Sequence, residues 1–408
     1  MVLLKSLLQK FPALWSYFVK WRARQQESAY RRWREHYATV KKPTSTLQLT
    51  KVPTVRSIGS VRTFAIVPSW SWHDALIRDL ELLGPVVRFD YAKDCTLKES
   101  SHYDRRFFEW RRKSNDDLLL RLQEAHAKEP FDWLFAYAQG DHLLASTMNE
   151  IRAKYQIPTV NMCLDDKNTW NSGTLDGQVA GSQGLASAFD LWWTSARVCA
   201  DWITAEGGRP LYLPEGCNPG SPPPPLRAFT IPVSFVGAAY GSRPAMVSFL
   251  RQHGIPVQTF GSGWGPETAV SSKEMSDIFK KSQLNLGHGG IGYSENITNV
   301  KGRDFDIPAA GGGAYLTTYN PDLAQHFHIG EEILCWHSYD DLLEQIRYYL
   351  ARPELCRAIA DKAFTRCVCE HRWLHRYTQI CSVFGILPPP VQSGACDTKT
   401  LNQLDHEA

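Results

Sequence analysis

Short hydrophobic runs alternate with amphipathic stretches along most of the chain. From residue 61, β-type runs such as Arg62–Pro68 and Asp132–Ala138 are separated by segments with apolar residues at three- and four-residue steps. The alternation restarts near residue 230, where Val233–Gly237 and Ala314–Thr318 are again β-type. Because alternating strands and helices form parallel sheets covered on both faces, the pattern predicts an α/β fold.

The expected elements follow in order along the chain. The predicted strands are 62–68, 86–89, 132–138, 158–164, 189–194 and 211–213, then 233–237, 257–261, 284–287 and 314–318. The predicted helices are 72–83, 101–128, 141–154, 243–253, 272–282, 303–310, 339–370 and a last one near 372–384, which we expect to return to the first half of the chain.

A proline-rich segment divides this pattern into two domains. A chain of 408 residues exceeds the roughly 250–300 residues that one core usually organises. Residues 217–229 contain five prolines and read as an interdomain linker. We therefore predict a helical extension with its own linker at 1–60, a first domain at 61–216, a second domain at 230–387, and a disordered tail at 388–408.

The first 42 residues form a basic amphipathic helical segment that Pro12 is expected to kink or divide. They hold ten Lys/Arg and two Asp/Glu, a balance of +8, whereas the whole chain carries +3. Such a helix either lies on a membrane surface or packs its apolar stripe on protein. Because the rest of the chain is slightly acidic, we expect no nucleic-acid-binding core.

The cysteines and the hydropathy point to an intracellular protein. The ten cysteines form no CxxC pair, so the sequence indicates neither a zinc ribbon nor a thioredoxin-like motif, and they are scattered without the pattern of a disulfide framework. No stretch approaches 18 uninterrupted apolar residues, and no cleavable signal is evident. We expect a cytoplasmic protein, with the basic extension as a candidate for peripheral attachment to the inner face of the cytoplasmic membrane.

The segment Lys301–Thr318, KGRDFDIPAAGGGAYLTT, carries the strongest chemical signal. A helix that begins in a parallel α/β unit favours a diphosphate at its N-terminus. Lys301 and Arg303 stand where this helix begins and are candidates to neutralise phosphates, and Asp306 is a candidate acceptor for ribose hydroxyls. Gly311, Gly312 and Gly313 either allow a ligand to approach the backbone or only pack the helix against the sheet.

Other candidates follow the ends of predicted strands, where ligands of open α/β sheets gather. In the second domain these are His288 in GHGGIGY and Arg243 in GAAYGSR. In the first domain they are His73, a candidate general base or a capping residue, and Asp165 and Asp166, candidates to hold or activate an acceptor.

The sequence resembles the CgeB-type spore-maturation glycosyltransferases, a branch of the GT-B enzymes. The resemblance rests on GRDFDIPAAGGGAYLTTYNPDL, GEEILCWHSYDDLLEQIRYYL and the EHRW…R ending, and it is thinner over 61–216, where IPTVNMCLDD and FDLWWTS fit. It implies two Rossmann-like doubly wound domains facing a cleft, with the nucleotide-sugar on the second domain and the acceptor on the first. It also implies no cofactor and no essential metal.

The implied function is transfer of a hexose-like sugar from a nucleotide-diphosphate-sugar to a glycan, lipid or protein acceptor in envelope or surface glycan synthesis. One departure concerns the paired Glu of retaining GT-B enzymes: Asp306 stands at the second position and Thr298 at the first, with Glu295 out of register. A catalytically decayed binding or scaffold protein and a nucleotide-sugar 2-epimerase are therefore the alternatives.

Overall fold

The computed structural model describes residues 12–43, 47–69, 72–93, 105–220, 228–265 and 268–389. The chain divides into two compact units. Of the described residues, unit 1 contains 12–32 and those of Cys217–His371, and unit 2 contains those of Trp33–Gly216 and 372–389. Most of the predicted linker 217–229 and of the tail 388–408 lies outside the described residues.

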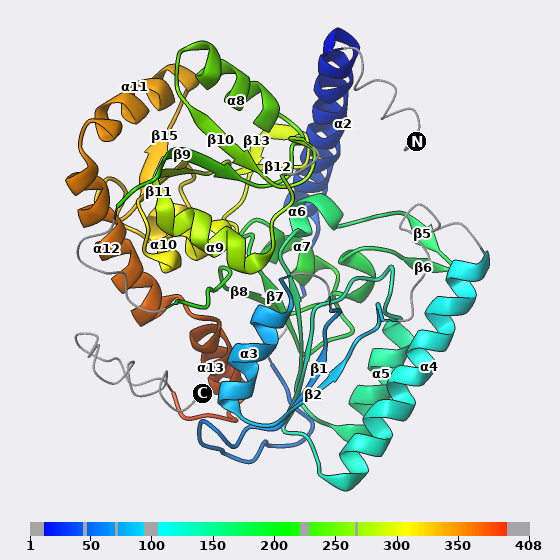
Figure 1. Cartoon of the computed structure of the whole chain (residues 1–408). Coiled ribbons are helices and arrows are strands. Elements are labelled where there is room, and N and C mark those ends of the chain that lie inside the picture. The colour runs from blue at the N-terminus through cyan, green and yellow to red at the C-terminus, as the bar shows by residue number, and fades with distance from the viewer. Residues whose placement is uncertain are drawn as a thin grey trace. The chain divides into compact units, whose positions relative to one another are not determined.

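Unit 1 is a doubly wound α/β unit around a parallel sheet in the order β10-β9-β11-β14-β15 (Figure 1). The strands are β9 (Ile231–Val236), β10 (Val257–Phe260), β11 (Ser282–Leu286), β14 (Ala314–Thr318) and β15 (Leu334–Trp336). The helices are α8 (Arg243–Gln252), α9 (Ser272–Lys281), α10 (Arg303–Ala310), η3 (Leu323–Gln325), α11 (Tyr339–Leu350) and α12 (Pro353–Glu370). An antiparallel hairpin of β12 (Gly290–Ile291) and β13 (Ser294–Thr298) follows β11.

Alternating side chains of the unit 1 strands pack into two separate hydrophobic clusters, one on each face of the sheet. Val233 and Phe235 of β9 join the cluster under α8 and α11, whereas Val236 joins the cluster with Phe279 of α9 and Phe305 of α10. Alternation is the consequence of the two-residue repeat of a strand. Burial on both faces confirms the parallel, doubly covered sheet that the sequence predicts.

Unit 2 repeats this architecture with a six-stranded parallel sheet in the order β2-β1-β3-β4-β7-β8. Its strands are β1 (Thr63–Ile66), β2 (Val86–Phe89), β3 (Trp133–Ala136), β4 (Thr159–Cys163), β7 (Leu191–Thr194) and β8 (Pro210–Tyr212), and β5 (Thr174–Leu175) pairs with β6 (Gln178–Val179). Its helices are α3 (Asp74–Leu83), α4 (Arg105–Lys128), α5 (Ala145–Tyr155), α6 (Asp166–Thr169), η2 (Gln183–Leu185), α7 (Cys199–Ala205) and α13 (Trp373–Val383).

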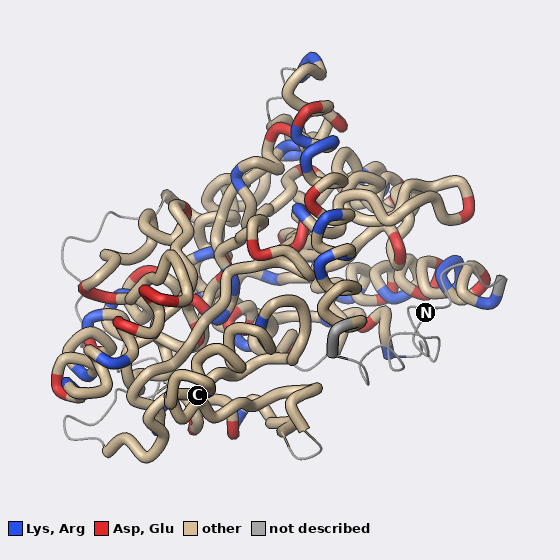
Figure 2. Tube along the Cα trace, turned by 90° about the horizontal axis from the view of Figure 1, so that it is seen from above, with Lys and Arg blue, Asp and Glu red and all other residues tan. Residues whose placement is uncertain are grey.

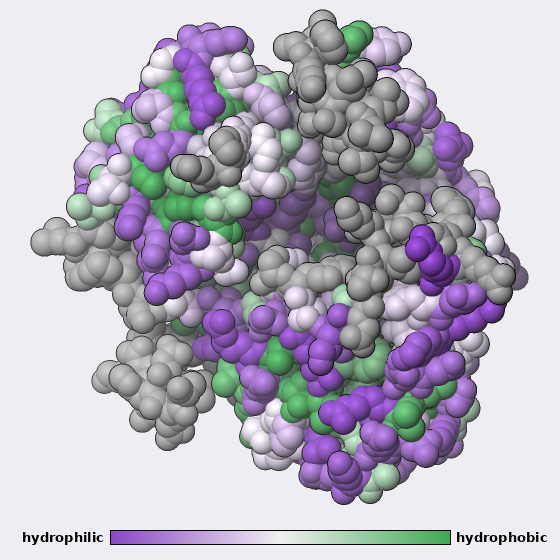
Figure 3. All heavy atoms as spheres, turned by 45° about the vertical axis from the view of Figure 1, so that its right-hand side comes forward, coloured by the Kyte–Doolittle hydropathy of each residue, from purple (hydrophilic) through white to green (hydrophobic). Residues whose placement is uncertain are grey.

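Helix α13 belongs to unit 2 although it follows unit 1 in the sequence. Its Trp373, Tyr377 and Ile380 pack into the core of unit 2, and the Tyr377 hydroxyl donates to the carbonyl of Leu76 in α3 at 3.2 Å. On the solvent side of unit 2, the long helix α4 presents mostly hydrophilic side chains at the lower right of Figure 3.

The single helix expected at 339–370 is split, because Pro353 has no N–H to continue α11 and instead begins α12. Of the helical segment expected at 1–42, helix α2 (Pro12–Thr39) is observed. Residues 1–11 lie outside the described residues, so the kink or division expected at Pro12 stays a prediction.

Charged residues of both signs are distributed over the described chain. Figure 2 shows Lys and Arg interspersed with Asp and Glu over most of it. Among the described cysteines, seven are free and buried, and Cys369 is disulfide-bonded. Among the described helices, none is long and apolar enough to cross a membrane.

Candidate functional site

The candidate site of unit 1 lies where the order of its strands reverses. Chain connections leave β9 toward β10 on one side and continue from β11 to β14 on the other. Ligands of doubly wound sheets bind outside the carboxyl ends of the strands at such a switch point. Here the loop 237–242 after β9 and the loop 287–289 after β11 occupy this position.

Arg303, the first residue of α10, rests its guanidinium against the loop after β9. A Cβ placed on Gly237, whose φ is +153°, would lie 2.7 Å from one terminal nitrogen of Arg303. The side chain is only partly buried, and no described residue accepts a hydrogen bond from it. A guanidinium offers five N–H donors in a planar fork, which matches the oxygens of a phosphate.

Asp306 stands one helical turn after Arg303, so the two side chains share a face of α10. The residue is half-buried, and its carboxyl group has no hydrogen-bond partner among the described residues. Burial raises the pKa of Asp306 to about 7, against an opposing effect of Arg303. The helix therefore presents an open cation and an open carboxyl group side by side.

Asp304 and Lys301 fix the start of α10. The buried Asp304 accepts from the backbone N–H of Lys301 at 2.8 Å and from the Tyr315 hydroxyl at 2.6 Å, and the Lys301 ammonium donates to the carbonyl of Gly290 at 2.6 Å. The N–H groups of 304–306 already bond to the carbonyls of residues 301 and 302. An anion at the start of α10 would therefore be bound mainly by the charges of side chains and less by free backbone N–H groups.

Arg243 begins α8 and is buried within its own loop. It lies 4.0 Å over the ring of Tyr240 and donates to the carbonyl of Ala238 at 3.2 Å. Burial lowers the pKa of Arg243 to about 10. The structure places Arg243 beneath the loop after β9, where its contacts hold the loop in shape.

His288, at the end of β11, is buried in a network of side chains. Its Nδ1 accepts the N–H of Gly290 at 3.2 Å, which assigns the proton to Nε2, 3.1 Å from the Ser242 hydroxyl and 3.9 Å from Glu295. Burial lowers the pKa of His288 and so favours the neutral ring. The interaction with His288 lowers the pKa of Glu295 to about 2, and the Tyr339 hydroxyl donates to the same carboxylate at 2.8 Å.

The glycine triplet packs against the protein itself. Gly311 ends α10 in the left-handed conformation, with φ +68°. A Cβ on Gly312 would lie 2.0 Å from the carbonyl oxygen of Phe279, and one on Gly313 would lie 2.0 Å from that of Gln283. The close approach that requires glycine here is to backbone around the α9–β11 junction, so ligand contact by Gly311, Gly312 and Gly313 remains a prediction.

Unit 2 contains a pocket of about 340 Å³ at the carboxyl ends of β3 and β4. Asp165, directly after β4, lines it together with other polar and aromatic residues. The remaining lining residues are Tyr91, Tyr137, Ala138, Gln139, Asp141, His142, Met162, Cys163, Thr169 and Ser172. Its position corresponds to the strand ends at which the sequence places an acceptor.

The other two predicted catalytic residues do not line this pocket. Asp166 is 1% exposed, with both carboxylate oxygens 3.4 Å from Nε1 of Trp192, and burial raises its pKa to about 6. His73 is 3% exposed, stacked on Trp72 with ring centroids 4.2 Å apart and 5.0 Å from the ring of Tyr137. Of the three, only Asp165 faces the pocket.

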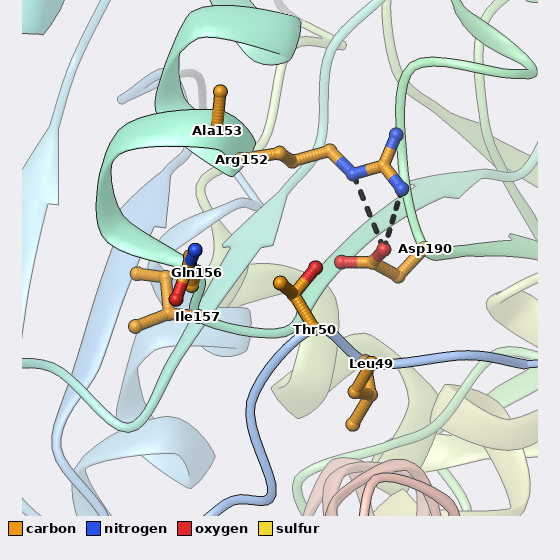
Figure 4. A pocket seen from close by; sticks show the side chains of 7 residues that line it. All are labelled: Leu49, Thr50, Arg152, Ala153, Gln156, Ile157 and Asp190. Atoms are coloured by element: carbon orange, nitrogen blue, oxygen red, sulfur yellow. Dashed lines mark hydrogen bonds and ion pairs between the residues drawn. The ribbon is translucent and has the colours of Figure 1, made fainter.

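A second pocket of unit 2, of about 150 Å³, lies at the opposite edge of the sheet (Figure 4). Arg152 and Asp190 both line it and form an ion pair with each other at 2.7 Å. The carboxylate of Asp190 also accepts from the backbone N–H and the hydroxyl of Thr159, each at 2.9 Å. Because Thr159 begins β4, this pocket is at the amino ends of the strands, and its charges are already paired.

Sequence reasoning did not assign Ser242 and Tyr339, and it noted Glu295 only as out of register. Tyr339 begins the helix after β15, at the same sheet edge as the other strand ends. The order of elements could therefore have suggested it. Glu295 lies in the β12–β13 hairpin, which has too few residues per strand to show a periodic pattern.

Comparison with known proteins links this architecture to sugar transfer. Residues 243–382 match the family described as "Glycosyl transferase-like". Among curated proteins, none is significantly similar in sequence.

Solved structures similar to the chain include sucrose-phosphate synthase from Thermosynechococcus elongatus, with 11% identity, a TM-score of 0.51 and coverage of 85% of this chain and 100% of the other. HepE of Anabaena, in complex with UDP and glucose, matches with 11% identity and a TM-score of 0.50 over 80% and 100%. A UDP-forming α,α-trehalose-phosphate synthase from Burkholderia vietnamiensis matches with 12% identity and a TM-score of 0.50 over 80% and 99%. The chain has the two-domain α/β GT-B fold, and the family match to its second half supports a glycosyltransferase.

Proposed function

We propose that this protein transfers a sugar from a nucleoside-diphosphate-sugar to an acceptor hydroxyl, and that unit 1 binds the donor. The observation that carries the proposal is the guanidinium of Arg303, which lies against Gly237 at the switch point without an acceptor among the described residues. An open cation at this place in a doubly wound sheet suits a diphosphate. The complex of HepE, a protein of the same fold, with UDP and glucose makes UDP the first nucleotide to test.

In the proposed mechanism, Arg303 donates to the diphosphate oxygens and stabilises the negative charge that grows as the sugar departs. The ammonium of Lys301, held on the carbonyl of Gly290, adds positive charge at the same helix start. Asp306 accepts hydrogen bonds from the ribose hydroxyls. Because these groups supply the charge stabilisation, the proposed reaction needs no metal and no cofactor.

The acceptor is proposed to bind the 340 Å³ pocket of unit 2, with Asp165 orienting or deprotonating its hydroxyl. The aromatic rings of Tyr91 and Tyr137 beside polar groups suit a hydroxylated acceptor such as a glycan. From the resemblance to CgeB-type enzymes we further propose a role in envelope or surface glycan synthesis, with a glycan, lipid or protein acceptor on the cytoplasmic side of the membrane.

The proposal is tested by thermal unfolding of the purified chain with UDP, GDP, dTDP, ADP and CMP and their sugars. A ligand that binds only the folded state raises the melting temperature. We expect one nucleotide diphosphate to do so, and Arg303→Ala to weaken its binding about tenfold or more, because a hydrogen bond to a charged group contributes about 1.5–3 kcal/mol.

Lys273→Ala is the matched control, since it removes an exposed positive charge of α9 in the same unit. It should leave nucleotide binding unchanged. If no nucleotide stabilises the wild type, or if Arg303→Ala binds as well as the wild type, the proposed donor site is wrong. Incubation with the bound sugar nucleotide then separates the activities: slow hydrolysis indicates a transferase, an isomerised donor a 2-epimerase, and neither a binding protein.

A further inference from the structure

Helix α2 leaves one apolar face exposed in its first half. Leu14, Tyr17 and Trp21 follow each other at three- and four-residue steps and therefore lie on one side of the helix. They are 53%, 72% and 45% exposed. Exposed aromatic and leucine side chains on one helix face are typical of a helix that lies in the interface between membrane and water.

The same side of α2 continues with positive charge. Arg24 and Arg31 continue the same helix face at three- and four-residue steps, and both are exposed. Lys20, which is also exposed, lies beside this face. Residues 14–34 contain six basic residues and one acidic residue, Glu27, whose carboxylate is already occupied by two hydrogen bonds. An apolar stripe bordered by basic residues is complementary to an anionic lipid surface.

Another face of α2 contacts the β12–β13 hairpin of unit 1. Gln26 donates to the carbonyl of Ile291 at 3.0 Å and accepts from the N–H of Tyr293 at 3.0 Å. Glu27 accepts from the Ser294 hydroxyl at 2.6 Å. Arg22 lies 5.5 Å over the ring of Tyr293. Part of the extension thus packs on protein, one of the two alternatives that the sequence leaves open.

The hairpin in turn holds the candidate donor site. Its Gly290 carbonyl receives the Lys301 ammonium, and its Glu295 lies 3.9 Å from His288. A Cβ on Gly241, in the loop after β9, would lie 2.6 Å from the carbonyl oxygen of Gly292. A change in the mobility of α2 is therefore transmitted through the hairpin to the conformation of the loops that surround Arg303.

We propose that an anionic lipid surface binds the Leu14–Tyr17–Trp21 face of α2 and thereby strengthens nucleotide binding by unit 1. A surface that fixes α2 also fixes the hairpin, so the ordering cost of the donor site is reduced before the donor arrives. Because coupling between two sites is reciprocal, nucleotide also strengthens membrane attachment. The inference rests on the proposed function, since it uses the donor site of unit 1.

The test measures UDP affinity of the full-length chain with vesicles of phosphatidylcholine and phosphatidylglycerol, with pure phosphatidylcholine vesicles, and in buffer. We expect sedimentation with the anionic vesicles only, and a UDP affinity about fivefold or more higher in their presence. The double variant Tyr17→Ser/Trp21→Ser should bind UDP in buffer as the wild type does, but should neither sediment nor respond to vesicles.

Gln26→Ala tests the internal connection, with its exposed neighbour Gln25→Ala as the matched control. Gln26→Ala should still sediment but lose most of the vesicle effect on UDP affinity, whereas Gln25→Ala should keep it. Absence of sedimentation overturns the lipid surface, as does a change in oligomeric state on Tyr17→Ser/Trp21→Ser, which would indicate a second copy as the occupant. Sedimentation without a change in affinity overturns the coupling. Failure of the wild type to bind UDP in buffer concerns the proposed function instead.

Discussion

Arg303 and Asp306 illustrate how a short stretch of sequence creates an open site. They are three positions apart on α10, and neither has a hydrogen-bond partner among the described residues, while Asp304 between them is buried and bonded to Tyr315. The buried carboxyl group anchors the helix, and the two open groups remain available to a ligand. The helix thus separates the anchoring carboxyl group from the groups proposed to bind donor.

The unusual pKa of Asp306 gives the first prediction at this scale. Burial raises it to about 7 from an unperturbed value of about 3.9. Between these values the unfolded chain has lost a proton that the folded chain keeps, so the free energy of unfolding falls as pH rises and levels off above pH 7. Asp306→Asn removes this dependence, and the variant should gain stability relative to the wild type by at most about 1.4 kcal/mol per pH unit between pH 5 and 7.

Urea denaturation of both proteins at pH 5, 6, 7 and 8 measures the difference. Asp277→Asn, on the exposed side of α9, is the control and should run parallel to the wild type. If the wild type and Asp306→Asn lose stability in parallel over this range, the carboxyl group of Asp306 is not protonated in the folded protein.

The sequence alone predicts that candidate residues lie close together when they are neighbours on the same helix. Lys301, Arg303 and Asp306 lie on one helix start, so their proximity is local. Glu295 and Tyr339 meet 44 positions apart in the sequence. Their contact depends on the tertiary position of the hairpin and of β15. For the same reason, the sequence could not show that Asp166 points toward Trp192 while Asp165 lines the pocket.

At the scale of elements, strong periodicity was a good guide and short segments were not. The predicted helix 303–310 and strand 314–318 agree with α10 and β14. The β12–β13 hairpin was missed, because GHGGIGY has no alternation and the contacts of the hairpin are with residues distant in sequence, such as Gln26 of α2, and with Lys301 just before α10. The helix predicted at 141–154 begins only at Ala145, after a turn in which the N–H groups of His142 and Leu143 bond to the carbonyl of Gln139.

The junction between α10 and β14 provides a prediction at this scale. A methyl group on Gly313 would lie 2.0 Å from the Gln283 carbonyl oxygen and 2.3 Å from that of Ser282, both backbone atoms that cannot rotate away. Gly313→Ala should therefore lower the free energy of unfolding by about 1–3 kcal/mol, the usual cost of overpacking. Urea denaturation of the purified variant gives the value.

Gly220→Ala is the comparison for this variant. A Cβ there would meet only the flexible end of Lys280, at 3.6 Å, so its stability should change by less than about 0.5 kcal/mol. Equal stability of Gly313→Ala and the wild type would show that the strand end can shift. Packing against the backbone would then not explain why glycine is present at these positions, and contact with a ligand would explain it better.

At the scale of the whole molecule, each unit has its own hydrophobic core. The core of unit 1 is built on β9 and β11, and that of unit 2 on β1, β3 and the returning helix α13. The sequence indicates two α/β halves because the strand–helix alternation restarts after the prolines. It cannot show the boundary within α2, where unit 1 ends at Arg32 and unit 2 begins at Trp33, because the helical pattern continues through it.

A donor that binds unit 1 should protect a limited part of the chain from hydrogen exchange. Exchange that occurs through local opening is slowed most where ligand contacts suppress that opening. With saturating nucleotide, we expect slower exchange in residues 237–243 and 287–306, and in residues 18–27 of α2, which contact the β12–β13 hairpin. Exchange in strands β1, β3 and β4 of unit 2 should remain as in the free protein.

Arg303→Ala, which should bind nucleotide about tenfold or more weakly, serves as the control, and at a nucleotide concentration that just saturates the wild type it should show much less protection. Protection that appears in 137–142 and 162–169 but not in 287–306 would move the nucleotide to the pocket of unit 2 and exchange the proposed roles of the two units. Protection of 287–306 without any change in 18–27 would leave the donor site in place but would remove the physical basis for its coupling to α2. The same experiment thus judges the donor site and its connection to the N-terminal helix separately.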